Sequence, residues 1–145
     1  MTVPASPTPS GDEIPAAVAA FRTALEEHRF ELLDRALADD VRRIALWRGG
    51  PDTIVGKPAY VEYLSSRPGA FHRWALRFVD IRVDRTGERV FAHVHEDLQR
   101  TAESPRLFID QLFAITLDRH GRIAEIDLYF KVDPPFARSV VERHG

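Results

Sequence analysis

Hydrophobic and polar residues alternate with a period of two through most of the segment 71–131. Side chains on a β-strand point to opposite faces in turn, so this alternation predicts long strands that each have one apolar face. The pattern predicts four strands, at 71–83, 88–99, 106–117 and 122–131, joined in antiparallel order by short turns. In the strand 71–83 the apolar set changes phase after Phe78, which predicts a bulge that bends the sheet.

The first part of the chain has helical spacing instead. A stripe of apolar residues predicts a helix from about residue 12 to 27, with Pro15 in its first turn; the stripe consists of Ile14, Val18, Phe21 and Leu25. Two further helices are predicted, one at 30–38 and one at 56–66, with a strand at 41–47 between them.

Polar and helix-breaking residues set the ends of these helices. We expect Asp39 and Asp40 to end the second helix, and Pro68 and Gly69 to end the third. Helices followed by a run of antiparallel strands predict an α+β fold, in which a curved antiparallel sheet wraps around the N-terminal helices. Such a sheet, closed by helices, would form a cone with an internal pocket.

Composition and charge narrow the class of protein. The chain has 145 residues, of which 44% are hydrophobic and 29% charged, as in a single globular domain. We expect a tail at 1–12 rich in proline, a domain at 13–135 and a second tail at 136–145. A net charge of −2 and no long apolar run predict a protein that binds neither nucleic acid nor membrane. The chain has no cysteine, which excludes disulfides and thiolate chemistry, and its start lacks the pattern of a secretory signal, so we expect a cytoplasmic protein.

Glu96 is the residue that departs from the strand pattern. It lies on the face of the strand 88–99 that is otherwise apolar, where a carboxylate is costly unless it has a purpose. Burial in a low-dielectric pocket would suit Glu96 to proton transfer, as a catalytic acid or base. The alternative is a structural carboxylate that is held by hydrogen bonds or by an arginine from a helix.

The pairing of the last two strands predicts which residues surround Glu96. Counting back from the turn at 118–121 places Leu128 opposite Gln111 and Ile126 opposite Phe113. On this pairing Gln111, Phe113 and Leu128 face the pocket, and Gln111 lies near Glu96. Gln111 would then orient a substrate carbonyl or serve only as a hydrogen-bond partner of Glu96.

Other side chains are weaker candidates for the site. His72 shares the face of Trp74, so it is a candidate second catalytic group, although an exposed histidine at the start of a strand explains it as well. Trp47, Tyr60 and Trp74 would be substrate-binding walls that stack on a flat ligand, or ordinary core residues. His93 and His95 have the spacing of a metal-binding pair, but we expect them to point outward without a third ligand, so no metal site is predicted.

The chain resembles the SnoaL-like branch of the nuclear transport factor 2-like superfamily. The resemblance is carried by segments 87–95 and 118–130, with 38–40 and 55–57 near the start. It implies a cone-shaped fold, a hydrophobic pocket and a homodimer formed through the outer face of the sheet. The superfamily includes isomerases, cyclases, dehydratases, epoxide hydrolases and proteins without catalytic activity.

The acidic residues of these enzymes are mostly replaced in this chain. Where the resemblance would place the base of ketosteroid isomerases stands Trp47, and their oxyanion-binding aspartate falls near Phe113. The acid in the last strand of epoxide hydrolases and SnoaL-type cyclases falls at Leu128. The Arg-x-Asp pair of the epoxide hydrolases falls at Val94 and Glu96, so an acidic residue is kept and the arginine is lost. The resemblance therefore does not imply epoxide hydrolysis by that mechanism.

Two functions follow as expectations. The favoured one is a cofactor-independent enzyme of the isomerase, cyclase or dehydratase type, in which Glu96 moves a proton on a small, mostly apolar molecule. Polyketide-like compounds are among the substrates that the resemblance implies. The alternative is a non-catalytic domain of the same fold that binds a small ligand or serves in assembly, and the replaced acidic positions favour it.

Overall fold

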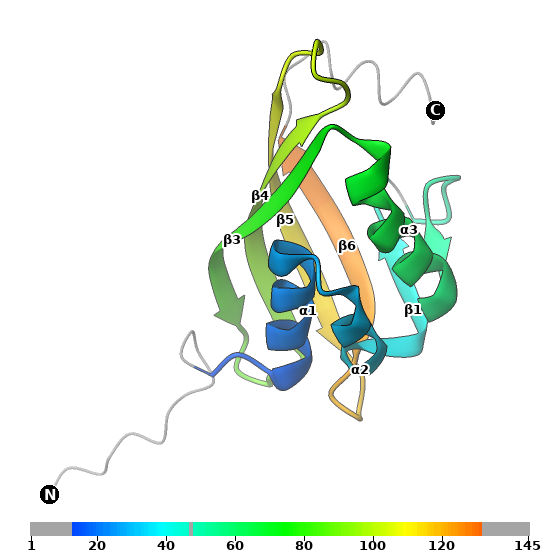
Figure 1. Ribbon diagram of the computed structural model, residues 1–145. Helices are drawn as coiled ribbons and strands as arrows, with labels where there is room; N and C mark the ends of the chain where they lie inside the picture. Colours follow the sequence, from blue (N-terminus) through cyan, green and yellow to red (C-terminus); the bar gives the residue numbers. More distant parts are fainter. Residues whose placement is uncertain (1–12, 47, 132–145) are drawn as a thin grey trace, which may run out of the picture.

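A layer of helices covers one face of a six-stranded sheet in the computed structural model, which describes residues 13–46 and 48–131 (Figure 1). The elements are α1 (Ala16–Glu27), the 3₁₀-helix η1 (Phe30–Leu32), α2 (Leu33–Ala36), β1 (Leu37–Ile44), β2 (Ile54–Val55), α3 (Lys57–Ala70), β3 (Arg73–Val83), β4 (Arg89–Gln99), β5 (Leu107–Leu117) and β6 (Ile123–Lys131). None of the described helices is long and apolar enough to cross a membrane.

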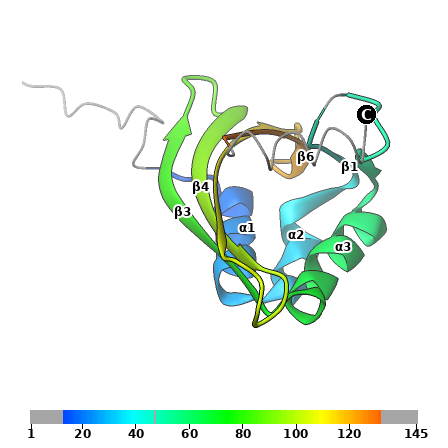
Figure 2. The same cartoon turned by 90° about the horizontal axis from the view of Figure 1, so that it is seen from above.

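The sheet curves around the helices without closing, as the view from above shows (Figure 2). Its strand order is β2-β1-β6-β5-β4-β3. The predicted α+β fold with a curved sheet around the N-terminal helices is therefore confirmed. The sheet is antiparallel except where β1 runs parallel to β6, a pairing between distant segments that the alternation within each strand does not indicate.

The predicted bend in β3 is also present. The pairing of β3 with β4 shifts between Phe78 and Asp80, as expected for a bulge. The backbone N–H of Phe78 donates to the Glu26 carboxylate at 2.7 Å, so a side chain from α1 takes the place of a strand partner. This bond attaches the first helix to the point where the sheet bends.

Two predicted helix ends are wrong. Asp39 and Asp40 do not end a helix but lie within β1, with both side chains exposed on the strand. Asp39 is held there by the Lys57 ammonium at 3.0 Å, which also contacts Asp34. Pro68 lies inside α3, which continues to Ala70, because a proline near the end of a helix removes only one of its last hydrogen bonds.

The predicted register of the last hairpin is wrong by two residues. Phe113 pairs with Leu128, and Gln111 pairs with Phe130. Next to the turn Leu117 pairs with Ile123, which is one residue beyond the predicted register, and the irregularity between this pair and Thr116–Glu125 adds a second residue on β6. A shift of two residues keeps every side chain on its face, so the predicted inward set is unchanged. Gln111, Phe113 and Leu128 are all buried.

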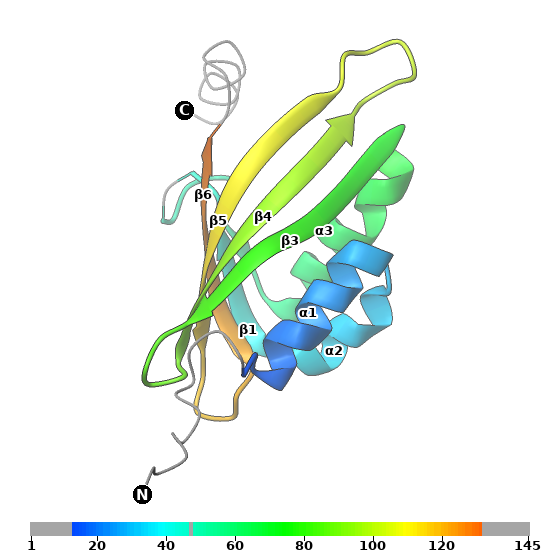
Figure 3. The ribbon, with the colours of Figure 1, turned by 90° about the vertical axis from the view of Figure 1, so that its left-hand side faces the viewer.

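The apolar core lies between the helices and the concave face of the sheet. Its largest fully buried side chains come from α1, α2 and all the long strands except β3, and include Phe21, Leu25, Leu33, Ile115 and Ile126. The opposite, outer face of the sheet carries no described helix (Figure 3). Large apolar side chains are exposed on that face, namely Phe108, Leu112 and Tyr129.

Candidate functional site

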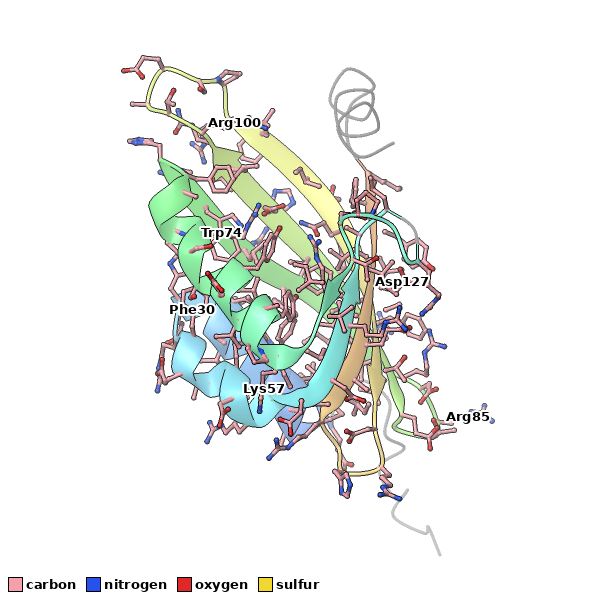
Figure 4. All side chains as sticks on the ribbon, turned by 90° about the vertical axis from the view of Figure 1, so that its right-hand side faces the viewer. Phe30, Lys57, Trp74, Arg85, Arg100 and Asp127 are labelled. Atoms are coloured by element: carbon pink, nitrogen blue, oxygen red, sulfur yellow. The ribbon has the colours of Figure 1, made fainter. Side chains whose placement is uncertain are left out.

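A cavity of about 500 Å³ lies between α3 and the inner face of the sheet. Most of its lining is apolar, and its polar members are Arg43, Asp52, Tyr60, Tyr63, Arg67, Glu96, Arg100 and Gln111. Trp74 of β3 lies beside α3, on the side of the sheet that faces the helices (Figure 4). The cavity is therefore a mostly apolar pocket with a few convergent polar groups, the usual form of a small-molecule site.

The Glu96 carboxylate is buried in the wall of this cavity, with 8% of the residue exposed. One oxygen, Oε2, accepts a hydrogen bond from Trp74 Nε1 at 2.7 Å, and the other, Oε1, accepts one from Gln111 Nε2 at 2.7 Å. Strand register brings the three residues together. Leu98 pairs with Trp74 and Ile109 pairs with Glu96, so both donors are diagonal neighbours of the carboxylate.

Arg67 places a positive charge next to this carboxylate. Its Nη2 atom is 3.9 Å from Glu96 Oε2, and its side chain is 20% exposed. The guanidinium carbon lies 4.7 Å from the ring centre of Tyr63, 4.9 Å from that of Phe71 and 5.6 Å from that of Trp74. At these distances the rings attract the cation and hold it in place.

A second polar group lies elsewhere in the cavity wall. Arg43 of β1 donates to the backbone carbonyl of Asp52 at 3.1 Å and to the hydroxyl of Tyr63 at 3.2 Å. The Asp52 carboxylate accepts the backbone N–H of Leu46 at 2.8 Å. These bonds attach the segment between β1 and β2 to α3, and so fix one side of the pocket.

Five of the side chains predicted to bind substrate line the cavity: Tyr60, Trp74, Gln111, Phe113 and Leu128. Burial raises the pKa of the Tyr60 hydroxyl, which therefore stays neutral. No hydrogen bond joins that hydroxyl to another side chain in the described ranges, so it is available to a ligand. The sixth predicted residue, Trp47, lies outside the described residues.

His72 is not brought to the site. Its side chain is exposed just before β3, its backbone N–H bonds the Arg100 carbonyl, and it is not part of the cavity lining. The cause is its place in the bend ahead of β3, where it does not join the inward alternation that starts with Trp74. The structure therefore separates His72 from Glu96, and we leave it out of the proposed chemistry.

His93 and His95 point outward, as predicted. His93 Nε2 lies 3.1 Å and His95 Nδ1 lies 2.9 Å from the same oxygen of Asp110. These hydrogen bonds, the one from His95 first, hold the pKa of the Asp110 carboxyl below its usual value. In the described part of the chain, no three acidic, histidine or cysteine side chains are placed to hold a metal ion.

Sequence reasoning missed five polar members of the cavity: Arg43, Asp52, Tyr63, Arg67 and Arg100. A signal for one of them was present. Tyr60, Leu64 and Arg67 follow helical spacing on the face of α3 that meets the pocket. Arg67 is thus a charged residue on an inward stripe, which is the argument that singled out Glu96 on its strand.

Comparisons with known proteins agree with the overall fold. A family model described as a SnoaL-like domain matches residues 18–126. No curated protein sequence matches the chain. An epoxide hydrolase of M. tuberculosis, described as LEH-like, has a similar structure with a TM-score of 0.65 and 24% identity over 88% of this chain and 92% of that one.

Two other solved structures have the same fold. One is SalBIII, described as an epoxide hydrolase/cyclase-like enzyme with a role in pyran ring formation in the polyether salinomycin; its TM-score is 0.66, with 16% identity over 79% of this chain and 88% of that one. The other is a computationally designed 17-OHP binder, with a TM-score of 0.65 and 17% identity over 82% of this chain and 95% of that one. At these identities the likeness concerns the fold alone.

Proposed function

Because the chain belongs to the family of SnoaL-like domains, we propose that it is an acid–base enzyme acting on a small, mostly apolar molecule in the cavity described above. The reaction would be an isomerisation, a cyclisation or a dehydration, and polyketide-like molecules come within this class of substrate. The observation that carries the proposal is the buried Glu96 carboxylate in the cavity wall, held by two N–H donors.

The two donors favour Glu96 as a base. A carboxylate that accepts hydrogen bonds from an indole N–H and an amide N–H is oriented and still has unused lone pairs on both oxygens. It would take a proton from a carbon next to a substrate carbonyl, and the electron pair of the broken C–H bond would move onto the carbonyl oxygen. Returning the proton to another carbon completes an isomerisation. In a cyclisation the enolate carbon would attack a second carbonyl carbon of the same molecule; the π bond of that carbonyl would break and its oxygen would take the proton from Glu96. In a dehydration the C–O bond at the β-carbon would break, and the hydroxide would leave as water with the proton from Glu96.

Size and lining support a small apolar substrate. A cavity of about 500 Å³ lies within the range that takes small organic ligands. Phe113, Leu128 and Trp74 would surround such a molecule with apolar surface, and the Tyr60 hydroxyl could hold a polar group on it.

A second candidate is a domain that binds a ligand without catalysis. One observation favours it: both Glu96 oxygens already have a partner from this chain, as in a purely structural carboxylate. Phe113 and Leu128 also occupy places where the resemblance would put acidic residues of enzymes. The computationally designed 17-OHP binder illustrates that a structure of this kind can be made to bind a ligand.

Exchange of substrate hydrogen with solvent deuterium separates the two functions. The probe is 2-tetralone, a small apolar ketone with exchangeable C–H groups, followed by NMR in deuterated buffer. We expect the protein to accelerate exchange and Glu96→Gln to abolish the acceleration while the ketone still binds. The matched control is Glu103→Gln, which changes an exposed glutamate in the β4–β5 loop and should keep the full rate.

Two other outcomes of this experiment would contradict the proposed enzyme. Binding of the ketone without faster exchange in the wild-type protein would support the binding domain. Equal exchange by wild type and Glu96→Gln would place the chemistry elsewhere and contradict the role of Glu96.

We also infer that the protein forms a homodimer through the outer face of the sheet. That face carries Phe108, Leu112 and Tyr129, all exposed, and Leu112 in the middle of β5 pairs directly with Tyr129 of β6. Aromatic and large apolar side chains at the centre of a face are characteristic of interface cores. Contact of one surface with its own copy is the commonest arrangement in protein dimers.

A further inference from the structure

Arg67 has hydrogen-bonding capacity that this chain does not use. A guanidinium has five N–H donors and no acceptor. Within the ranges 13–46 and 48–131, the polar partner recorded for Arg67 is Glu96, and the separation of 3.9 Å is too long for a hydrogen bond. The cation is nevertheless part of the cavity lining and only 20% exposed.

We propose that Arg67 binds an anionic oxygen of the ligand, so that the molecule taken by this cavity is an apolar compound carrying a carboxylate or a comparable acidic oxygen group. The proposal concerns the ligand of the same cavity and rests on the proposed function only for the role of Glu96. The ligand proposed for the cavity is a small organic acid with a flat or bulky apolar body.

Aromatic rings leave the donors of Arg67 free while they fix its position. Tyr63, Phe71 and Trp74 surround the guanidinium at 4.7 to 5.6 Å from its carbon to their ring centres. Rings attract a cation through their faces and accept no conventional hydrogen bond from it. The N–H groups therefore stay available for two parallel bonds to a carboxylate, the strongest geometry for this pair.

Glu96 does not need Arg67 as a hydrogen-bond donor. Its two oxygens already accept bonds from Trp74 and Gln111, each at 2.7 Å. If Arg67 were only a structural counter-ion, a direct contact would be the more stable arrangement, since charge-assisted bonds form at 2.7 to 2.9 Å. The separation instead leaves the guanidinium beside the base and able to contact a ligand.

The charge of the lining favours an anion. Three arginines and two carboxylates line the cavity: Arg43, Arg67, Arg100, Asp52 and Glu96. Arg43 is engaged by the Asp52 carbonyl and the Tyr63 hydroxyl. These two partners are neutral and do not cancel the charge of Arg43. The lining therefore keeps a surplus of positive charge, which attracts an anion strongly where water is excluded.

Paired probes test the inference by calorimetry. The acid 2-naphthoate and the neutral amide 2-naphthamide have the same apolar body and differ in the group that Arg67 would contact. We expect the wild-type protein to bind the acid at least about tenfold more tightly than the amide, as charge-assisted pairing allows. Arg67→Gln should remove this preference by weakening the acid and leaving the amide nearly unchanged.

Two further variants complete the design. Arg67→Lys keeps the charge but not the planar pair of donors, so it should retain part of the preference. Arg85→Gln changes an arginine in the turn after β3, at the far end of the sheet from Arg100 (Figure 4), and should behave as wild type. The amide also reports on folding, because a variant that still binds the amide has kept its cavity.

The inference is overturned if the wild-type protein binds acid and amide equally, if it binds neither probe, or if Arg67→Gln keeps the preference. Its failure is separable from that of the proposed function. Glu96→Gln removes a negative charge beside Arg67, so binding of 2-naphthoate should persist or strengthen while exchange of 2-tetralone is lost. A preference for the acid without any exchange would leave the anion site standing and the enzyme proposal refuted.

Discussion

At the scale of single residues, the protein tolerates a carboxylate among apolar side chains because the strand register delivers its partners. Trp74 and Gln111 are both diagonal neighbours of Glu96 on the strands that flank it. A buried indole N–H needs a hydrogen-bond acceptor and a buried carboxylate needs donors, and the bond from Trp74 to Glu96 meets both needs. The tryptophan is therefore both a wall of the cavity and a polar contact.

Replacing Trp74 with phenylalanine tests this double role. The ring remains, but the carboxylate loses a hydrogen bond at 2.7 Å, so we expect the free energy of unfolding to fall by about 1–3 kcal/mol. Urea denaturation measures the change. In the double variant with Glu96→Gln the loss should be smaller, because the charged acceptor is gone. Equal losses in both backgrounds would show that the bond contributes nothing beyond packing.

Residue-scale prediction from sequence succeeded where a single strand decided the answer. Alternation along the strand 88–99 was enough to place Glu96 inward, and the turn at 118–121 placed Gln111 near it despite the error of two residues in register. Arg67 lies on an inward stripe of α3, but arginine on a helix is usually exposed, so the stripe alone does not single it out. Arg43 lies on β1, and its bonds to Asp52 and Tyr63 come from packing between separate segments.

At the scale of elements, hydrogen bonds made by charged side chains hold the helices and loops that form the cavity against the sheet. Glu26 of α1 accepts the Phe78 N–H at the bulge of β3. Arg48 reaches β6 from the loop before β2 and contacts both Glu125 oxygens, at 2.7 and 3.1 Å. That loop also contributes lining residues, so its attachment bears on the shape of the pocket.

Glu26→Gln should weaken the attachment of α1. The charge-assisted bond to the Phe78 N–H would become a neutral one, and the ion pair with Arg22 would be lost, so we expect a loss of about 1 kcal/mol in the free energy of unfolding. Thermal or urea unfolding measures it. Glu27→Gln, one residue later and exposed, is the control and should change stability little. Equal effects of the two substitutions would mean that the bulge needs no charged acceptor.

The Arg48–Glu125 pair makes part of the stability depend on pH. The hydrogen bond from Arg48 lowers the pKa of the Glu125 carboxyl from its usual 4.5. A lowered folded-state pKa means that the stabilisation is complete above the unfolded value and is lost as the pH falls through the folded value. Both side chains are partly exposed, so the contribution is about 0.5–1 kcal/mol.

Glu125→Gln checks the sign of this dependence. The difference in unfolding free energy between wild type and variant should be largest near pH 7. It should shrink as the pH falls below 4.5 and through the lowered folded-state pKa, because the wild-type carboxyl then becomes protonated as well. Urea denaturation across that range gives the curve. A difference that stays constant with pH would assign the effect to packing and not to the ion pair.

Element boundaries were predictable where local pattern and structure agree. The strands β3 to β6 begin and end within about two residues of the expected positions, and the change of phase after Phe78 indicated the bulge. Asp39 and Pro68 misled because each is tolerated for a reason that the residue type alone does not show. Asp39 lies on β1 with Lys57 of α3 as its partner, and Pro68 lies in the last turn of α3, where few helical bonds remain. The parallel pairing of β1 with β6 joins segments that are far apart in the sequence, so no local pattern predicts it.

At the scale of the molecule, the two faces of the sheet carry different groups of side chains. The inner face holds the helices and the cavity, whereas the outer face carries exposed Phe108, Leu112 and Tyr129 together with the His93–His95–Asp110 cluster (Figure 3). Exposed apolar side chains grouped on one face often mark a contact site. Under the proposals above, the inward pattern of β5 would serve ligand binding and its outward pattern would serve assembly.

Leu112→Arg tests the proposed dimer at the centre of that face. Sedimentation equilibrium should give twice the chain mass for the wild-type protein. A charge placed beside its symmetry mate, with loss of apolar contact, should weaken the dimer by at least about tenfold, or about 1.4 kcal/mol. Val55→Arg is the control, because Val55 is also an exposed apolar residue but lies on β2, away from the patch, and the substitution should leave the dimer intact. Far-ultraviolet circular dichroism should be unchanged in both variants. A wild-type monomer at all concentrations would refute the proposed dimer. A dimer that survives Leu112→Arg and is lost in Val55→Arg would place the interface away from the outer-face patch.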